Sequence, residues 1–216
     1  MSTAPTIADN FTVFGIDISK YQGNEINSLN KQTDNLTFII CKATEGITYT
    51  DPDFKTNWPA IQAKGFVRGA YHFYHCDDDP AKQVANYLGV VGQLSKTDFP
   101  PIVDFEETSI DPGIDKTTIQ PNLLQFLTLL EQKTGRKPLI YTDNNTANAY
   151  LTDPAFAAYK LWIADYNATL TLPNVWKSQP WTIWQKSASY TLDNQSNDFD
   201  VFNGDETAFT KFIQSS

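Results

Sequence analysis

The stretch of sequence that decides the fold reads Pro100-Pro101-Ile102-Val103-Asp104-Phe105-Glu106-Glu107-Thr108. Its apolar first half predicts a short buried strand, which ends at two carboxylates spaced i, i+2. Residues two apart in a strand point to the same side, so Asp104 and Glu106 should face one cavity while Phe105 packs on the other side. Paired carboxylates at a strand end are what acid-catalysed glycoside cleavage needs. Taken alone, the stretch fits a strand that runs into a solvated acidic turn equally well.

Short apolar, β-rich segments recur along the whole chain. The eight predicted strands cover residues 11–18, 36–41, 67–74, 102–105, 138–141, 160–164, 182–185 and 199–202. Apolar periodicity and terminal signals predict helices over residues 53–65, 80–88 and 118–133. After the fifth strand the connections are shorter and less helical. Alternating strands and helices imply parallel βα units, so we predict an α/β fold: a single irregular (β/α) TIM-like barrel with helices missing or short in its second half.

A flat, doubly wound sheet is the main structural alternative. Such a sheet more often carries a glycine-rich phosphate loop after its first strand. The corresponding segment here is Gly15-Ile16-Asp17-Ile18-Ser19, which is not a loop of that kind. The barrel is therefore favoured, and the chain is long enough to form one.

The composition is that of an acidic globular protein of 216 residues with a formal net charge of −9. This charge argues against nucleic acid or an anionic membrane as a partner. No window approaches the length of a membrane span. Since no linker or repeat divides the chain, we expect an N-terminal extension over residues 1–10 and one catalytic barrel domain over residues 11–216, acting as a monomer.

The cysteines and histidines suggest no disulfide framework and no metal site. Cys41 and Cys76 each lie in an apolar or aromatic run, so buried free thiols are expected. His72 and His75 lack the flanking ligands of a zinc motif, and we expect neither a metal nor a cofactor. The N-terminus has no basic region and no apolar core, so a secretory signal is not visible and synthesis in the cytosol is expected.

Polar or aromatic residues stand at the ends of most predicted strands. In chain order they are Asp17, Ser19 and Gln22; Lys42 and Glu45; Tyr71, His72 and Tyr74; Asp104 and Glu106; Tyr141 and Asp143; Trp162 and Asp165; Trp184 and Gln185; and Asp198 and Asp200. The C-terminal strand ends of an α/β barrel form one face, where the active site lies. Carboxylates interleaved with Tyr and Trp suit a sugar, which stacks its C–H faces on rings. Only two arginines are present, which disfavours a phosphate ligand.

Six motifs, in a consistent order over roughly residues 14–205, resemble the glycoside hydrolase family 25 lysozymes (Chalaropsis type). The motifs are Gly15-Ile16-Asp17-Ile18-Ser19 with Tyr21-Gln22-Gly23, Lys42-Ala43-Thr44-Glu45-Gly46, Gly69-Ala70-Tyr71-His72-Phe73, Val103-Asp104-Phe105-Glu106, Leu161-Trp162-Ile163-Ala164, and Asp198-Phe199-Asp200-Val201-Phe202-Asn203-Gly204. The resemblance implies an irregular barrel that hydrolyses the β-1,4 bond between N-acetylmuramic acid and N-acetylglucosamine in peptidoglycan. The peptidoglycan strand would then be its partner, reached after release or dedicated export.

The resemblance also implies roles for individual residues. Glu106 would be the general acid, Asp104 its partner, and Asp17 and Asp198 the other members of an acidic cluster. Substrate-binding candidates are Tyr71, Tyr141, Trp162, Lys42, Glu45, Gln22 and Asp200.

The i, i+2 spacing leaves the mechanism open. Carboxyls about 5–5.5 Å apart suit a covalent retaining path, and about 6.5–9.5 Å suits inversion. A third route uses the substrate's 2-acetamido oxygen as the nucleophile, with Asp104 orienting it and Glu106 acting as acid, and this is the route we favour. Crowded carboxylates should raise at least one pKa and keep one acid protonated near neutral pH.

Two other functions compete with a lysozyme. A glycan-binding or inhibitory barrel would have lost catalysis, but Asp17, Asp104, Glu106 and Asp198 are all present. A chitinase-like hydrolase would usually show a longer Asp-x-x-Asp-x-Asp-x-Glu run. The residues before Asp104 are Pro100, Pro101, Ile102 and Val103, so that run is absent.

Overall fold

Eight strands close into a barrel in this computed structural model, which describes residues 11–23, 25–192 and 195–215. The barrel strands are β1 (Phe14–Ile18), β2 (Phe38–Glu45), β4 (Val67–Phe73), β5 (Ile102–Asp104), β6 (Leu139–Asp143), β7 (Lys160–Ala164), β8 (Ile183–Leu192) and β9 (Gln195–Phe202). β1 pairs with both β2 and β9, which closes the barrel, and β3 (Tyr49–Thr50) forms a small hairpin with β2. The predicted irregular barrel is confirmed, while the predicted extension over residues 1–10 lies outside the described residues.

The direction of the last strand differs from the prediction. Neighbouring strands from β1 to β8 run parallel where they pair around the barrel, as βα units require, but β9 is antiparallel to both β8 and β1. Only two residues separate β8 from β9, whereas a parallel connection needs a crossover of a dozen or more. The expectation that Asp198 and Asp200 stand at a C-terminal strand end was therefore wrong, because Asp198 lies in the N-terminal half of β9.

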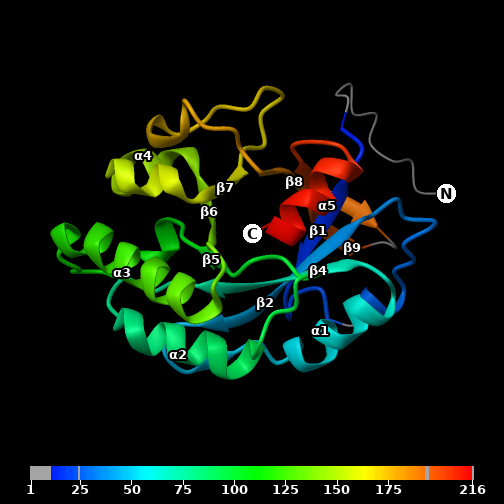
Figure 1. The fold of residues 1–216 in the computed structure, drawn as a ribbon, viewed down its shortest axis with the longest axis horizontal. Helices are drawn as coiled ribbons and strands as arrows, with labels where there is room; N and C mark the ends of the chain where they lie inside the picture. The colour runs from blue at the N-terminus through cyan, green and yellow to red at the C-terminus, as the bar shows by residue number, and fades with distance from the viewer. Residues whose placement is uncertain (1–10, 24, 193–194, 216) are drawn as a thin grey trace.

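The helices cover the outside of the first half of the barrel (Figure 1). They are α1 (Phe54–Ala63), α2 (Pro80–Val91) and α3 (Lys116–Thr134), close to the three predicted helices. Asp79 caps α2 by accepting a 2.9 Å hydrogen bond from the Lys82 amide, and Gly135 ends α3 with a φ of 68°. Among its described residues the second half has only α4 (Asn144–Tyr150) and short 3₁₀ turns before α5 (Glu206–Ser215), and the sequence predicted neither α4 nor α5.

Two apolar clusters hold the fold together. The larger one lies between the strands and the outer helices, and the smaller one fills the barrel interior. Phe209 and Ile213 of α5 belong to the interior cluster together with Phe38, so α5 packs against the end of the barrel where β2 begins. Gly15 makes room for this packing, since a Cβ there would lie 2.2 Å from the Phe38 ring.

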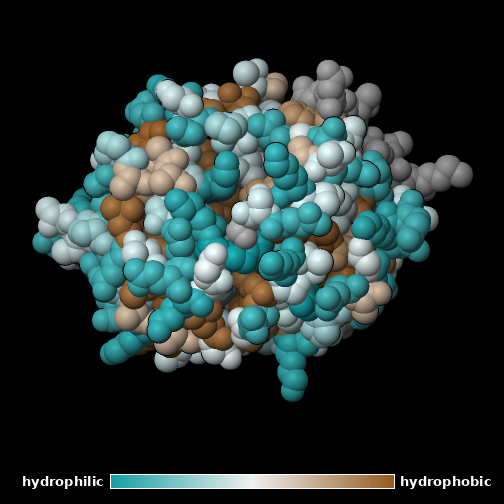
Figure 2. All heavy atoms as spheres, in the orientation of Figure 1, coloured by the Kyte–Doolittle hydropathy of each residue, from teal (hydrophilic) through white to brown (hydrophobic). Residues whose placement is uncertain are grey.

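The surface agrees with the acidic, polar composition. The face in Figure 2 is covered mainly by hydrophilic residues, with apolar residues scattered between them. Within the described part of the chain, no helix combines the length and apolar character that crossing a membrane requires. Cys41 and Cys76 are both buried and unpaired, as predicted.

Candidate active site

The barrel interior changes from apolar to polar along each strand. On β5 and β6 the apolar Ile102 and Leu139 are followed, two positions later, by Asp104 and Tyr141 on the same inner side. The residues that line the resulting cavity are Asp17, Tyr71, Asp104, Glu106, Tyr141, Trp162, Gln185 and Asp198. Seven of these side chains come from the barrel strands, and Glu106 lies just beyond β5.

A wider groove joins this cavity. The cavity has a volume of about 110 Å³ and the groove about 570 Å³, and Glu106 and Tyr141 line both. The groove's other walls come from Asp143, Asn144, Asn145, Ala164, Asp165, Tyr166, Asn167 and Thr171. Tyr166 is 57% exposed at this wall. Sequence reasoning missed it, because it lies beyond the strand end in a loop with no distinctive pattern.

The two carboxylates of the opening stretch reach the same cavity. Asp104 is the last residue of β5 and pairs with Phe73 and Tyr141 on the neighbouring strands. Glu106 follows the strand, where its amide donates a 3.1 Å hydrogen bond to Ser109 Oγ and its carbonyl accepts 2.9 Å from the Ser109 amide. Phe105 is fully buried in the outer cluster. The two carboxylates thus face the cavity and Phe105 packs on the other side, as predicted.

The Asp104–Glu106 pair has the electrostatics of a shared proton. Burial raises the pKa of Asp104 well above its usual range, and the negative charge of Glu106 raises it further. Burial also raises the pKa of Glu106, followed by the charge of Asp143. Lys42 opposes both shifts. Because two close carboxyls in a buried site cannot both ionise easily, the pair retains a proton toward neutral pH.

A hydrogen-bonded network holds the opposite wall. The Gln185 side-chain amide donates a 2.7 Å hydrogen bond to Asp17, and its carbonyl oxygen accepts from Tyr141 at 2.9 Å and from Tyr166 at 2.8 Å. Burial raises the pKa of Asp17 well above its usual value, and Asp198 adds to the increase. Asp198 itself is half-buried, and burial raises its pKa as well. Gln185 was noted as a polar strand end but not as a site residue.

Asp200 and Gln22 do not line the cavity. Asp200 is fully buried below it and accepts a 2.8 Å hydrogen bond from the Trp162 indole. Burial raises the pKa of Asp200 well above its usual value, and the charge of Asp17 raises it further. Gln22 lies in the turn after β1, where its side chain accepts a 2.9 Å hydrogen bond from the Ser19 amide. Both residues support cavity-forming segments.

Lys42 and Glu45 lie on β2 beside the cavity. They form an ion pair of 2.6 Å, and Glu45 also contacts His75 at 2.9 Å. Burial raises the pKa of Glu45, but Lys42 and His75 outweigh it and the net pKa is lowered. Neither residue belongs to the cavity lining, so neither is placed as a direct binding residue of that cavity.

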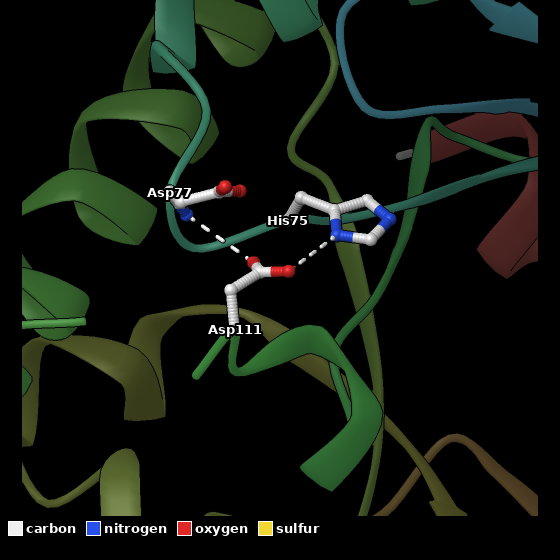
Figure 3. A group of neighbouring side chains, drawn as sticks. All are labelled: His75, Asp77 and Asp111. Atoms are coloured by element: carbon white, nitrogen blue, oxygen red, sulfur yellow. Dashed lines mark hydrogen bonds and ion pairs between the residues drawn. The ribbon is translucent and has the colours of Figure 1, made fainter. Parts of the chain in front are cut away.

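His75, Asp77 and Asp111 form a compact hydrogen-bonded group (Figure 3). One side-chain polar atom from each residue lies within 4.8 Å of those of the other two. Asp111 contacts His75 at 3.4 Å and accepts from the Asp77 amide, also at 3.4 Å. The other His75 nitrogen faces Glu45. Both nitrogens of His75 thus have a carboxylate partner, and the group was not predicted because Asp111 comes from a different loop.

Comparison with other proteins identifies the family to which the chain belongs. The chain matches the family model for glycosyl hydrolases family 25 over residues 16–195. It is 33% identical over 220 residues to the uncharacterized protein YegX of Escherichia coli O157:H7, covering 98% of this chain and 77% of that one. It is 31% identical over 203 residues to the N,O-diacetylmuramidase of Chalaropsis sp., covering 86% and 93%. A bacterial lysozyme structure from Streptomyces coelicolor superposes with a TM-score of 0.85 at 26% identity, covering 96% and 99%. The chain therefore belongs to glycosyl hydrolases family 25, the lysozyme family that its motifs resemble, and it is a glycoside hydrolase.

Proposed function

We propose that this glycoside hydrolase is an N-acetylmuramidase that cleaves the β-1,4 bond between N-acetylmuramic acid and N-acetylglucosamine in peptidoglycan. The proposal rests mainly on the Asp104–Glu106 pair. Both carboxylates line one cavity, together with three aromatic side chains and two further carboxylates. The muramidase and lysozyme names of the relatives support the same substrate. Its place of action would be the cell wall, reached after release or export.

Glu106 is the proposed general acid. It lies where the small cavity meets the wider groove, so a glycan that occupies both would place a glycosidic oxygen near it. An acid at that position protonates the leaving oxygen while the bond from that oxygen to the anomeric carbon breaks. Burial and the neighbouring Asp143 charge raise the pKa of Glu106, which helps it hold the proton to be donated.

Asp104 is the proposed partner of the substrate's acetamido group. The acetamido oxygen attacks the anomeric carbon, and the ionised Asp104 accepts a hydrogen bond from the acetamido N–H. That bond favours the charged form of Asp104, so substrate binding lowers its pKa and moves the shared proton onto Glu106. Water then opens the cyclic intermediate, with Glu106 taking a proton from it, and the product keeps the β configuration.

The remaining wall residues would bind and orient the sugars. Tyr71, Tyr141 and Trp162 present rings to the cavity, and rings stack on the C–H faces of sugars. Tyr141 and Trp162 are fixed edge to face, with ring centroids 4.6 Å apart. Asp17 and Asp198 supply acceptors for hydroxyl or amide groups on the side opposite the catalytic pair.

A turbidity assay on purified cell walls tests the activity, and NMR of the first product anomer tests the route. We expect lysis by the wild type and loss of lysis, with a melting temperature no lower than that of the wild type, in Asp104→Asn. An initial β-anomer agrees with acetamido participation, and an initial α-anomer excludes it. Binding of glycan without any cleavage would instead favour a glycan-binding barrel.

A further inference from the structure

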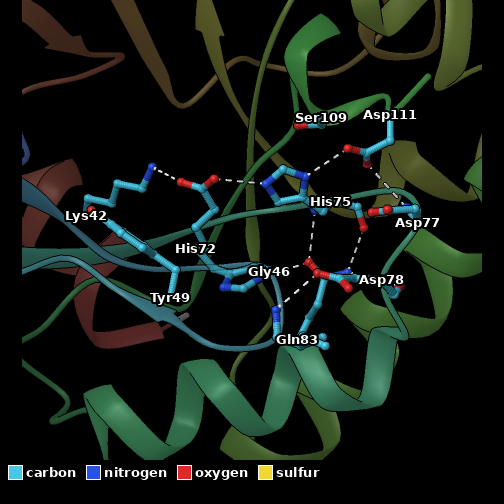
Figure 4. Close-up of polar contacts among 12 residues, drawn as sticks. Lys42, Gly46, Tyr49, His72, His75, Asp77, Asp78, Gln83, Ser109 and Asp111 are labelled. Carbon is cyan, nitrogen blue, oxygen red and sulfur yellow. Dashed lines mark hydrogen bonds and ion pairs between the residues drawn. The ribbon is translucent and has the colours of Figure 1, made fainter.

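A chain of charged side chains runs from the barrel interior to the surface loops (Figure 4). Lys42 Nζ lies 2.6 Å from Glu45 Oε2, and Glu45 Oε1 accepts from His75 Nε2 at 2.9 Å. On its other side His75 Nδ1 lies 3.4 Å from Asp111 Oδ1. The mechanism described above uses none of these four residues directly. Because these contacts are continuous, we consider the four side chains together.

The inner end of this chain acts on the catalytic pair. Lys42 follows Phe38 and Ile40 at two-residue intervals on β2, and both of those side chains belong to the barrel interior. Its side chain is only 14% exposed. The positive charge of Lys42 lowers the pKa of both Asp104 and Glu106. The position of the Lys42 ammonium therefore affects the proton that the pair shares.

At the outer end of this series, His75 is held by the side chains around it. Each ring nitrogen of His75 faces a carboxylate, so a protonated ring donates to both Glu45 and Asp111. Burial lowers the pKa of His75, but these two carboxylates outweigh it and the net pKa is raised. Asp77, Asp78 and Asp79 are the acidic residues of its own loop. The Phe73 ring lies 5.4 Å from the imidazole between centroids.

Gly46 allows the two segments to approach closely. A Cβ at this position would lie 2.6 Å from Asp78 Oδ2 and 3.4 Å from the His75 ring, and its φ is +52°. Asp78 in turn accepts a 3.1 Å hydrogen bond from the Ile47 amide. The turn after β2 and the loop after β4 are thus packed against each other, which fixes His75 relative to Glu45.

The loop of His75 also contacts the segment that carries Glu106. The amide of Cys76 donates 2.9 Å to the carbonyl of Ser109, and Ser109 Oγ accepts 3.1 Å from the Glu106 amide. The neighbouring Tyr74 amide also donates 3.0 Å to the carbonyl of Asp104, so the loop of His75 is connected to the catalytic pair through backbone contacts as well as through side chains. Only the side-chain route passes through Lys42, so the two routes can be separated by mutation.

We propose that His75 is a positioning residue for the cleavage reaction: it holds Glu45, and through Glu45 it keeps the Lys42 ammonium beside Asp104 and Glu106. This inference rests on the proposed function for its kinetic consequence but not for its structural one. Without His75, Glu45 loses one of its two hydrogen-bond partners, and Lys42 loses the fixed carboxylate that orients it.

The test is a double-mutant cycle read as the rate of peptidoglycan hydrolysis at sub-saturating substrate. We expect His75→Leu to reduce the rate about tenfold, the size expected for losing one hydrogen bond to a charged group. In a Lys42→Met background the same change should cost less than about twofold, because the two residues act in series. His75→Gln, which can still donate to Glu45, should recover most of the wild-type rate. Glu107→Gln, an exposed carboxylate change in the adjacent turn, is the matched control and should have no effect.

Each outcome decides the matter. An equal loss in both backgrounds would mean that His75 acts only through the fold, and no loss in His75→Leu would remove its role altogether. A failure of His75→Gln to recover the rate, at an unchanged melting temperature, would also overturn the proposal. If His75→Leu does not fold, Glu45→Gln replaces it in the cycle, with the same loss and the same dependence on Lys42 expected.

An NMR measurement separates this proposal from the proposed function. A held lysine ammonium exchanges its protons slowly enough to be observed by ¹⁵N detection, so the Lys42 signal should be present in the wild type and lost in His75→Leu. Persistence of the signal in the variant contradicts the proposal whether or not the protein cleaves peptidoglycan. An intact chain of contacts in a wild type that cleaves no glycan would count against the proposed function alone.

Discussion

Gln185 and Asp17 are 168 positions apart in the sequence, yet the Gln185 amide donates a 2.7 Å hydrogen bond to the Asp17 carboxylate in the wall of the cavity. The bond is possible because β9 lies between β1 and β8 in the closed barrel. The carbonyl oxygen of the same amide accepts from Tyr141 and Tyr166. One uncharged side chain therefore orients a carboxylate and two tyrosines at once.

Replacing Gln185 by Leu should impair catalysis more than folding. The change removes the donor to Asp17 and leaves two tyrosine hydroxyls without their acceptor, so we expect about a tenfold or greater loss of kcat/KM. Steady-state kinetics on soluble peptidoglycan fragments measure it. Gln179→Leu, at an exposed position outside the cavity, is the control. Equal kinetics in the two variants would show that the network does not support the reaction.

The alkaline limb of the pH–rate profile should depend on Asp143. Its negative charge raises the pKa of Glu106, so Asp143→Asn should lower that pKa and move the alkaline limb to lower pH. In the wild type Asp143 caps α4 by accepting hydrogen bonds from the first amides of the helix. Asn also caps helices well, so α4 should be retained in the variant. Asp153→Asn changes another capping residue outside the cavity and should leave the limb in place. A shift to higher pH in Asp143→Asn would contradict the electrostatic assignment.

Stability should fall as the pH rises from acid toward neutral. Burial raises the pKa of Asp200 well above its unfolded value of about 3.9, so between these two values the native state binds more protons than the unfolded chain. In that window the free energy of unfolding decreases with rising pH. Asp200→Asn cannot ionise and keeps an acceptor for the Trp162 indole, so its melting temperature should fall less with pH.

Thermal melts of both proteins across this pH range measure the difference. Asp17 and Asp104 have raised pKa values as well, so the variant should reduce the slope rather than abolish it. The exposed Asp205→Asn serves as the control, with a slope like that of the wild type. An unchanged slope in Asp200→Asn would mean that Asp200 is ionised in the folded protein.

The barrel interior should reject a side chain at residue 15. A Cβ at Gly15 would overlap the Phe38 ring, so Gly15→Ala should cost about 1–3 kcal/mol of unfolding free energy. Gly89→Ala is the matched control, because α2 leaves open space there and alanine favours a helix by up to about 1 kcal/mol. Urea unfolding gives both values. A Gly15→Ala variant as stable as the wild type would contradict the packing described here.

Local patterns in the sequence were sufficient to predict most of the barrel. The strand that ends near Asp104 and the helices over residues 53–65, 80–88 and 118–133 depend on neighbouring residues, and the structure confirms these elements. The antiparallel direction of β9 was missed because it follows from the two-residue connection to β8. The length of that connection depends on where β8 ends and β9 begins, which their pairing sets and no local pattern shows. The helix α5 was missed although Phe209 and Ile213 have helical spacing, because its stability comes from packing at the end of the barrel.

The candidate site shows the same division. The i, i+2 spacing predicted that Asp104 and Glu106 would face one cavity, and the recurrence of polar residues at strand ends, together with the family resemblance, predicted Asp17 there. The contacts that orient them join distant segments, such as Glu45 with His75 and Asp17 with Gln185. No local spacing encodes those contacts, since they depend on how the barrel closes and how its loops pack.

Mass spectrometry of the products from purified peptidoglycan tests the central claim most directly. The wild type should release fragments with N-acetylmuramic acid at the reducing end, and Glu106→Gln, folded to the same melting temperature, should release almost none. Reducing-end N-acetylglucosamine, or the same fragments at a near wild-type rate from Glu106→Gln, would contradict the account.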